Sequence, residues 1–455
     1  MFRERVKRFH FVGIGGIGMS GIAQILLDMG YEVSGSDLKE NKNTQLLRRK
    51  GAKVYIGHSE ENLGDAQVVV YSSAVGEGNP EIRRARERSI PVISRGEMLA
   101  ELFRLGEGIA VCGSHGKTTT TSMIAHVFHE AGYDPTVLIG GVLQRFGSNA
   151  KLGRDGLIIS EADESDGSFL KLLPTVAVIT NIDREHLGFY SGIEQIKEAF
   201  LNFANLVPFY GFVVLNADDE NCRWVMERTK KRVLTLGMER EAYLRAQKLR
   251  LEGGRYRFEV LKDGRVLGEV HLGVPGRHNV YNALACSLVC LEAGIDFRTI
   301  SSALGSFRNA ERRMELKGYY RGAPLYDDYG HHPTEIEAVL RALRDVHPER
   351  KLILVFQPHR YSRTYYLFDD FVRVLKNADV GFLTDVYPAG EENLYGVSAE
   401  VLAQLAGYTF CPTKEELFNI LEDTISSKDM VVFMGAGNIS KWCEEFLSSY
   451  ERHIG

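Results

Sequence analysis

The sequence has little of what marks membrane, secreted or nucleic-acid-binding proteins. No apolar run approaches the roughly 18 residues that a membrane-spanning helix needs. The 55 basic residues are outnumbered by 60 acidic ones, which gives a net charge of −5 and no positive excess for nucleic acid. The six cysteines form no Cys-x-x-Cys pair and no regular framework, which favours a reducing compartment. We therefore expect a cytoplasmic protein that binds neither nucleic acid nor membrane.

One stretch, between Gly108 and Met123, predicts a phosphate-binding loop. A short apolar run suited to a buried strand ends at Cys112, and helical character begins at Lys117. Glycines between them allow backbone N–H groups to turn toward an anion, and the start of the helix adds its positive dipole end. Lys117 would reach the outer phosphates of a nucleotide, and the Thr118 hydroxyl would bind magnesium. We therefore predict ATP binding at Gly113, Ser114, His115, Gly116, Lys117, Thr118 and Thr119.

A second glycine loop lies near the start of the sequence. An apolar strand leads into Gly13-Ile-Gly15-Gly-Ile-Gly18, a helix follows to about Met29, and a second strand ends in Asp37. Glycines in this pattern, with an acidic residue about twenty positions later, are typical of a dinucleotide-binding turn. The pattern indicates only that a diphosphate can lie against a helix start, so NAD is one reading among several nucleotide ligands.

Acidic residues and a histidine follow two predicted strands in the middle of the chain. Residues 157–160 form an apolar run that is followed by four carboxylates within six positions, beginning at Glu161. The next strand, residues 176–180, leads to His186. The carboxyl ends of parallel strands share one edge of a sheet, and oxygen ligands there suit a hard divalent cation. Glu161 and His186 are thus candidate metal ligands, against the simpler alternatives of a solvated helix cap and a structural histidine.

Asn279 and Asn282 stand three positions apart in a predicted helix and therefore share one of its faces. Their amides could read the edge of a base, or Asn279 could simply cap the start of the helix. The sequence favours neither reading.

Aromatic and basic side chains follow two predicted strands in the last third of the chain. Tyr329 and His331 come after the strand at 325–328, and Arg360 and Arg363 come after the strand at 352–356. Two clusters of this composition at strand ends are seldom part of a core. We expect them to bind a ligand or to act in catalysis.

The order of the predicted elements indicates an α/β protein of three domains. A length of 455 residues leaves room for about three domains, and strands that alternate with helices favour mainly parallel sheets. We expect a Rossmann-like domain at 1–106, a P-loop ATPase-like domain at 107–307 and a second Rossmann-like domain at 308–455.

Taken together, the motifs resemble those of the Mur ligases, the amino-acid-adding ligases of peptidoglycan synthesis, over nearly the whole chain. The resemblance is carried, in order, by GIGGIGMSGIA, GSHGKTTTT, EADESDGSF, TNIDREHLGFY, PGRHNVYNALA, ERRMELKG, DDYGHHPTEI and FQPHRYSRT. Two departures concern single positions. Ser114 stands where the loop commonly has Thr, and Phe200 stands where several sister ligases carry a modified lysine, with Lys197 about one helical turn earlier. The second departure favours the alanine-adding branch.

The resemblance implies a ligand for each domain. The first glycine loop would hold the diphosphate of a UDP-sugar, not NAD, through Gly15, Gly16, Ile17, Gly18, Met19, Ser20, Asp37, Ser72, Ser73, Ala74 and Arg95. Besides its loop, ATP would contact Asn279, Asn282, Arg313 and Asp328. The metal ligands would be Thr118, Glu161 and His186, and the amino acid would bind at Tyr329, His331, Arg360 and Arg363.

The implied reaction joins L-alanine to the lactyl carboxylate of UDP-N-acetylmuramate. The carboxylate would attack the γ-phosphate of ATP with the help of magnesium, for which manganese could substitute, and the amine of alanine would then attack the acyl phosphate. The catalytic residues would be Lys117, His186, His331 and Arg363, with His331 as a hypothetical base and Arg360 or Arg363 as the partner of the amino-acid carboxylate. The partners are thus small molecules, and the chain would act as a monomer or homodimer whose domains close around them.

Other readings remain open from the sequence. A muropeptide-recycling ligase or another Mur branch would use the same chemistry with a different amine. A folylpolyglutamate-type ligase would leave the N-terminal domain without a role. An NAD-dependent UDP-sugar dehydrogenase would explain the first glycine loop but leave residues 113–119 idle, and a non-catalytic nucleotide-binding regulator would leave the acidic and His/Arg clusters unused.

Overall fold

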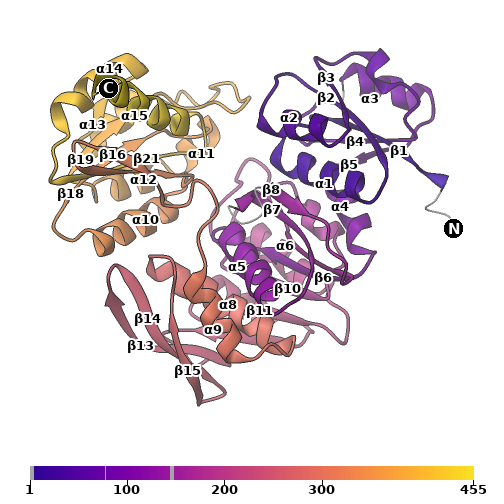
Figure 1. Ribbon diagram of the computed structural model, residues 1–455, viewed down its shortest axis with the longest axis horizontal. Coiled ribbons are helices and arrows are strands. Elements are labelled where there is room, and N and C mark those ends of the chain that lie inside the picture. The colour runs from indigo at the N-terminus through magenta and orange to yellow at the C-terminus, as the bar shows by residue number, and fades with distance from the viewer. Residues whose placement is uncertain (1–4, 77, 144–147, 455) are drawn as a thin grey trace.

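Three sheets, each flanked by helices, make up the computed structural model of the chain, which describes residues 5–76, 78–143 and 148–454 (Figure 1). We name the parts built on them the N-terminal, central and C-terminal domains. In Figure 1 the N-terminal domain (indigo) and the C-terminal domain (yellow) both lie above the central one. Among the helices in the described ranges, none is long and apolar enough to cross a bilayer.

The N-terminal sheet is entirely parallel, with strand order β3-β2-β1-β4-β5. Its elements are β1 (Arg8–Val12), α1 (Ile17–Asp28), β2 (Glu32–Asp37), α2 (Lys42–Arg49), β3 (Lys53–Ile56), η2 (Glu60–Leu63), β4 (Val68–Tyr71), α3 (Pro80–Glu87), β5 (Val92–Ser94) and α4 (Arg95–Phe103). The first glycine loop joins β1 to α1 at the carboxyl edge of this sheet, where nucleotides bind in such folds.

The central sheet has the order β15-β14-β13-β12-β11-β10-β6-β9-β7-β8. Its strands from β13 to β7 run parallel, with β8 antiparallel at one edge and the β13-β14-β15 meander at the other. The elements are β6 (Glu107–Cys112), α5 (Lys117–Glu130), β7 (Thr136–Leu143), β8 (Ser148–Lys151), β9 (Leu157–Glu161), η3 (Ser168–Lys171), β10 (Val176–Ile179), α6 (Ile193–Ala204), β11 (Phe212–Asn216), α7 (Glu220–Met226), β12 (Val233–Gly237), β13 (Leu244–Glu252), β14 (Arg255–Lys262), β15 (Arg265–His271), α8 (Arg277–Glu292) and α9 (Phe297–Ser306).

The C-terminal sheet has the order β16-β17-β21-β18-β19-β20 and is parallel except for β16. Its elements are β16 (Glu315–Tyr320), β17 (Ala323–Asp328), α10 (Pro333–Val346), β18 (Lys351–Phe356), α11 (Tyr361–Tyr366), α12 (Phe368–Leu375), β19 (Val380–Leu383), α13 (Ala399–Ala406), β20 (Thr409–Phe410), α14 (Lys414–Thr424), β21 (Asp429–Met434) and α15 (Ile439–Ile454). The predicted three-domain α/β fold with mainly parallel sheets is confirmed. The edge strands β3, β16 and β20 were missed because most of their residues are partly or fully exposed and lack an apolar pattern.

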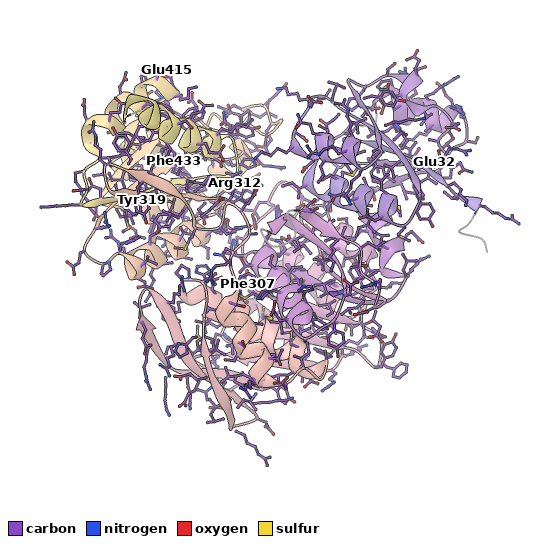
Figure 2. The ribbon with its side chains drawn as sticks, in the orientation of Figure 1. Glu32, Phe307, Arg312, Tyr319, Glu415 and Phe433 are labelled. Atoms are coloured by element: carbon purple, nitrogen blue, oxygen red, sulfur yellow. The ribbon has the colours of Figure 1, made fainter. Side chains whose placement is uncertain are left out.

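The apolar cores join two of the domains more closely than the third. Phe11 of β1 and Phe103 of α4 belong to the same buried cluster as Phe169 and Phe203 of the central domain. The C-terminal sheet has buried clusters of its own on its two faces. Figure 2 shows the passage between domains: Phe307 lies in the central domain, whereas Arg312 already lies against the C-terminal sheet and pairs with its Asp327.

A hairpin of the central domain fixes the N-terminal domain in place. Strands β7 and β8 pack against α1, as Figure 1 shows. Asn149 of β8 donates its amide to the Ile17 carbonyl at 2.5 Å, and Gln24 of α1 donates to the Asn149 side chain at 3.1 Å. The start of α1, which carries the first glycine loop, is therefore held directly on the central domain.

Inside the N-terminal domain, the fully buried carboxylate of Glu81 joins β1, β2 and α3. Glu81 accepts hydrogen bonds from Ser36 at 2.5 Å, from Asn62 at 2.7 Å and from the Ser59 N–H at 3.1 Å, and it lies 3.1 Å from His10 Nε2. Burial by itself raises the pKa of Glu81, but these partners outweigh burial and hold it below its usual value. The carboxylate is therefore ionised and satisfied.

Replacing Glu81 by Ala should lower the free energy of unfolding of the N-terminal domain by about 3–5 kcal/mol, because it leaves buried donors unpaired. Urea unfolding followed by circular dichroism measures the loss. The matched control is Glu87→Ala on the same helix, where an exposed carboxylate pairs with Arg84 at the surface and the transition should stay unchanged. Equal transitions for the two variants would contradict this account.

Candidate active site

Residues from all three domains line one cavity of about 790 Å³ at the carboxyl edges of their sheets. The N-terminal domain contributes the start of α1, and the central domain contributes the loop between β6 and α5. Of the predicted site residues, the lining includes Gly16, Ile17, Gly18, Met19, Ser72, Ser73, Arg95, Ser114, Gly116, Lys117, Thr118, Glu161, His186, Arg313, Tyr329, His331, Arg360 and Arg363. Residues predicted on separate grounds in three parts of the sequence thus face the same space.

The central loop has the backbone geometry that an anion site requires. Gly116 caps α5 in the left-handed conformation, at φ +82°, and an added Cβ there would meet the Asn282 side chain at 2.6 Å. The His115 N–H is held by Asn181 Oδ1 at 2.8 Å, which ties the loop to the end of β10. The α5 helix therefore presents its N-terminus, with Lys117 and Thr118, to the cavity.

Lys117 pairs with a buried carboxylate that the sequence analysis did not single out. Its ammonium group lies 2.7 Å from Glu164 Oε1 and also donates to the Gly113 carbonyl at 2.5 Å. Burial by itself lowers the pKa of Lys117, but the charge of Glu164 outweighs it and raises the pKa above its usual value. Lys117 is therefore a fixed positive charge beside the loop.

The predicted metal ligands fit a divalent cation by the chemistry of their donors. Glu161 is half-buried beside Thr118, and desolvation raises its pKa although the Gly140 N–H, bound at 2.6 Å, opposes this. His186 lines the same cavity, and its Nε2 lies 3.3 Å from Glu164 Oε1 and 3.7 Å from Glu185 Oε2. Glu164 Oε2 is buried without a hydrogen-bond partner, so this group has an unsatisfied acceptor. Oxygen-rich sites with an unmet acceptor suit Mg²⁺.

A second cavity of about 480 Å³ adjoins the first at Gly116, Arg313 and Glu335. It is lined by His115, Thr119, Asn279, Asn282 and Asp328 among others. Burial raises the pKa of Asp328 to about 6, against the charge of Arg313. The proposal that Asn279 caps its helix is wrong, because α8 begins after Gly276 and its start carries no side-chain cap. The two amides instead bond each other at 2.9 Å.

The C-terminal residues reach the large cavity from three places. Tyr329 and His331 come from the loop after β17, Arg360 comes from the loop after β18, and Arg363 comes from α11. His331 Nδ1 lies 3.0 Å from the Tyr329 carbonyl, which can only accept, so this nitrogen carries a proton. Arg363 and His331 both approach Glu185 of the central domain, at 3.3 and 3.6 Å. Burial raises the pKa of Glu185, but His186, His331 and Arg363 together bring it well below its usual value.

The N-terminal site residues divide into two groups. Arg95 reaches across to the central domain and pairs with Asp163 at 2.8 Å, in the acidic run after β9. Asp37 accepts the Gly15 N–H at 2.9 Å and thereby stabilises the glycine loop. Gly15, Asp37, Ser20 and Ala74 do not belong to the described lining of the large cavity.

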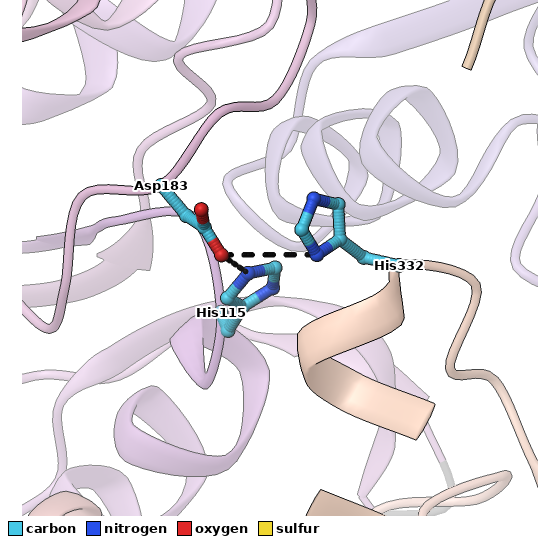
Figure 3. A group of neighbouring side chains, drawn as sticks. All are labelled: His115, Asp183 and His332. Carbon is cyan, nitrogen blue, oxygen red and sulfur yellow. Dashed lines mark hydrogen bonds and ion pairs between the residues drawn. The ribbon is translucent and has the colours of Figure 1, made fainter. Parts of the chain in front are cut away.

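His115 makes a contact that its position in the ATP loop did not predict. Figure 3 shows one carboxylate oxygen of Asp183 joined to both His115 and His332, and His115 Nε2 lies 3.0 Å from the Asp183 carboxylate. Its other ring nitrogen faces Glu335 at 3.6 Å. Burial lowers the pKa of His115, but Asp183 and Glu335 outweigh burial and raise it to about 10.

Three acidic residues of the site escaped the sequence analysis: Glu164, Glu185 and Glu335. The sequence could have pointed to two of them, because Glu164 lies in the acidic run after the strand at 157–160 and Glu185 directly precedes the candidate metal ligand His186. Glu335 lies in the first turn of α10, where an acidic residue has an ordinary capping role. Only the packing of α10 against the central domain reveals its contact with His115.

Three family descriptions match successive parts of this sequence. The Mur ligase family catalytic domain matches residues 8–106, the Mur ligase middle domain matches 111–290, and the Mur ligase glutamate ligase domain matches 312–437. The chain belongs to the Mur ligase family. The resemblance inferred from the motifs is confirmed.

Relatives within the Mur ligases match over nearly the whole length. The UDP-N-acetylmuramate–L-alanine ligase of Aquifex aeolicus is 64% identical over 447 residues, which cover 98% of each chain. The crystal structure of the UDP-N-acetylmuramate-alanine ligase of Thermotoga maritima has a TM-score of 0.85 at 30% identity, covering 98% of this chain and 99% of that one. A murein peptide ligase of Psychrobacter arcticus shares the fold, with a TM-score of 0.77 at 24% identity and 98% of each chain covered.

Phe200, which the sequence analysis placed where sister Mur ligases carry a modified lysine, lies in the core. Phe200 of α6 is fully buried and meets the Phe169 ring edge-on, with centroids 5.5 Å apart. Lys197 pairs with Glu194 at 2.6 Å and lies over the Trp224 ring. Neither residue belongs to the described cavity lining.

Replacing Gly116 by Ala should weaken ATP binding at least about tenfold, a loss of roughly 1.4 kcal/mol. The added Cβ would be strained at positive φ and would collide with Asn282. Gly132→Ala is the matched control, since Gly132 ends the same helix at φ +89° with nothing within 4 Å of an added Cβ. Calorimetry should show weakened binding only for Gly116→Ala; equal ATP affinities would contradict the loop assignment.

Proposed function

We propose that this Mur ligase joins L-alanine to the lactyl carboxylate of UDP-N-acetylmuramate, with ATP as the energy source and ADP and phosphate as products, in peptidoglycan precursor synthesis. The names of the Aquifex and Thermotoga relatives support this reaction. The single observation that carries it is the large cavity, because one space holds a glycine loop for each of two phosphate-bearing ligands and the basic cluster of the C-terminal domain. A ligase must bring three substrates together in this way.

The two adjoining cavities suggest how ATP would lie. The adenosine would occupy the smaller cavity beside Asn279, Asn282 and Asp328, and the phosphates would pass over Gly116 into the larger one. The loop N–H groups and Lys117 would then surround the transferred phosphoryl group. The UDP-sugar would bind from the opposite side, with its diphosphate at the start of α1 and near Arg95.

Thr118, Glu161 and His186 would hold Mg²⁺, with Glu164 and Glu185 close enough to assist. When bound, the cation supplies neutralisation of charge on the phosphoryl oxygens. Lys117 would have to release Glu164 as the phosphates arrive, since its ammonium group now contacts that carboxylate.

The reaction has two steps, and different protein residues would assist each of them. A carboxylate is a poor electrophile toward an amine, so the lactyl carboxylate first attacks the γ-phosphate and forms an acyl phosphate. Lys117 would stabilise the charge that develops on the phosphate. Arg363 or Arg360 would hold the carboxylate of alanine, and the amine would attack the acyl carbon and expel phosphate. His331 is our candidate for the group that accepts the amine proton, because it lines this cavity.

Further assignments belong to the same proposal. The domain limits are 1–106 for the UDP-sugar domain, 107–307 for the ATP domain and 308–455 for the amino-acid domain. The protein acts in the cytoplasm as a monomer or homodimer on small-molecule substrates, and Mn²⁺ can replace Mg²⁺. A muropeptide-recycling ligase is the nearest alternative. An NAD-dependent dehydrogenase is disfavoured, because it gives the ATP loop no role.

Phosphate release from ATP and Mg²⁺ in the presence of UDP-N-acetylmuramate tests the function. L-alanine and a tripeptide are supplied singly, and the product is weighed by mass spectrometry. Release that depends on L-alanine, with the matching amide, is the expected result. Release with the tripeptide alone would identify a recycling ligase, and no release with any amine would overturn the ligase assignment.

Replacing Lys117 by Ala should abolish phosphate release, because it removes the ammonium group that would contact the transferred phosphoryl group, while UDP-sugar binding persists in the other domain. The assay above measures turnover, and calorimetry measures sugar binding. Lys248→Ala, an exposed lysine of β13 that pairs with Glu259, serves as control and should be fully active. Retained turnover in Lys117→Ala would remove the ATP assignment.

Replacing Arg363 by Lys should raise the KM for L-alanine roughly 10- to 100-fold, the loss expected for a charge-assisted hydrogen bond worth about 1.5–3 kcal/mol. The KM for ATP should change little. Arg373→Lys on the exposed face of α12 is the control. Unchanged KM values for alanine in both variants would exclude Arg363 as the carboxylate partner.

A further inference from the structure

The group formed by His115, Asp183 and His332 joins the ATP loop to the C-terminal domain (Figure 3). Asp183 Oδ2 lies 3.0 Å from His115 Nε2 and 3.8 Å from His332 Nδ1. One donor atom from each side chain lies within 4.8 Å of the other two. The reaction proposed above assigns no role to Asp183 or His332.

We propose that His115, Asp183 and His332 form a binding site for a first-row transition-metal ion such as Zn²⁺, separate from the magnesium site. Two imidazoles and one carboxylate are a common donor set for such ions. The ion would take the place of the proton between His115 Nε2 and Asp183 Oδ2, which would leave to solvent.

The surroundings of each histidine orient one ring nitrogen toward this point. His332 Nε2 lies 3.2 Å from the Arg184 carbonyl, which can only accept, so the proton of the neutral ring is on Nε2. Its Nδ1 lies 3.8 Å from Asp183 Oδ2 and accepts the Thr334 N–H in a 3.3 Å hydrogen bond, which a bound ion would replace. His115 Nδ1 is buried, has no hydrogen-bond partner and faces Glu335 at 3.6 Å. Metal-bound histidines usually direct their second N–H at a carbonyl or carboxylate in this manner.

The carboxylate is oriented as well, and the spacing fits a small ion. Thr334 donates its hydroxyl to Asp183 Oδ2 at 2.7 Å. Bonds of about 2.0–2.2 Å to Zn²⁺ place neighbouring donor atoms roughly 3.3 Å apart in a tetrahedral site. The observed distances from Asp183 Oδ2 lie on either side of this value, so small side-chain rotations would complete the site.

The donor atoms distinguish this group from the magnesium site. Among the described residues, the other group of this kind is Glu164, Glu185 and His186, which offers two carboxylates and one imidazole. Mg²⁺ prefers oxygen ligands, whereas a pair of imidazoles favours Zn²⁺, Ni²⁺ or Cu²⁺. Excess Mg²⁺ should therefore leave the His115–Asp183–His332 group available to Zn²⁺.

The position of the ligands gives the site a structural consequence. His115 and Asp183 belong to the central domain, and His332 caps the start of α10 in the C-terminal domain. A bound ion would hold the two domains together next to Tyr329 and His331, which lie three positions and one position before His332.

Calorimetric titration of Zn²⁺ into the full chain, in excess Mg²⁺, tests the site. His332→Asn should weaken Zn²⁺ binding at least about tenfold, because asparagine can still cap α10 for the Thr334 N–H but supplies no imidazole. The matched control, His271→Asn, removes an exposed histidine of β15 and should bind Zn²⁺ as the wild type does. His186→Asn at the magnesium site should also leave this affinity unchanged.

A second variant and a second measurement keep the test valid even if His332→Asn does not fold. Asp183→Asn keeps an acceptor for Thr334 but lacks the charge, and it should weaken Zn²⁺ binding similarly. The visible absorption of bound Co²⁺ should lose its nitrogen-ligand features in His332→Asn and keep them in His271→Asn. Equal Zn²⁺ affinity of the wild type, His332→Asn and Asp183→Asn, or a loss seen only in His186→Asn, would overturn the proposal. The measurement needs no turnover, so it stands apart from the proposed reaction.

Discussion

Buried carboxylates at the meeting point of the central and C-terminal domains are the constraint on which the site depends. Glu164 is held by Lys117, and Glu185 is held by Arg363 and His331. An unpaired buried carboxylate costs several kcal/mol, so each needs a cation close by. Because Arg363 and His331 come from the other domain, satisfying Glu185 also brings the C-terminal basic cluster into the cavity.

In the proposed reaction, substrate binding would be an exchange of ion pairs. Phosphate oxygens that approach Lys117 would compete with Glu164, and an amino-acid carboxylate that approaches Arg363 would compete with Glu185. Glu164 already has one buried oxygen without a hydrogen-bond partner among the described residues. The carboxylates released in this exchange would suit a divalent cation, so the same few side chains would couple the binding of nucleotide, cation and amino acid.

The distribution of apolar and strained residues supports movement of the C-terminal domain relative to the other two. The N-terminal and central domains share a buried cluster and the Asn149 contacts, whereas the C-terminal domain has its own clusters and meets the central domain through polar side chains. Polar interfaces within a chain favour relative domain motion. His186 and Arg360 adopt positive φ of 55° and 70° on the two sides of this interface, and strain of this kind gathers at ligand sites.

The sequence by itself determined the two glycine loops and the buried strands that lead into the site. Apolar runs before glycines or acidic residues predicted β1, β6, β9 and β10. The Gly113–Thr119 loop could be predicted from the sequence, because its local backbone geometry requires those residue types. The sequence could not decide whether Asn279 contacts a nucleotide base or caps its helix, since both roles use the same side-chain amide. Only the tertiary structure decided that Glu185 and Glu335 of different domains face His331 and His115. Such contacts depend on how separately folded domains pack, and no short-range pattern in the chain records that packing.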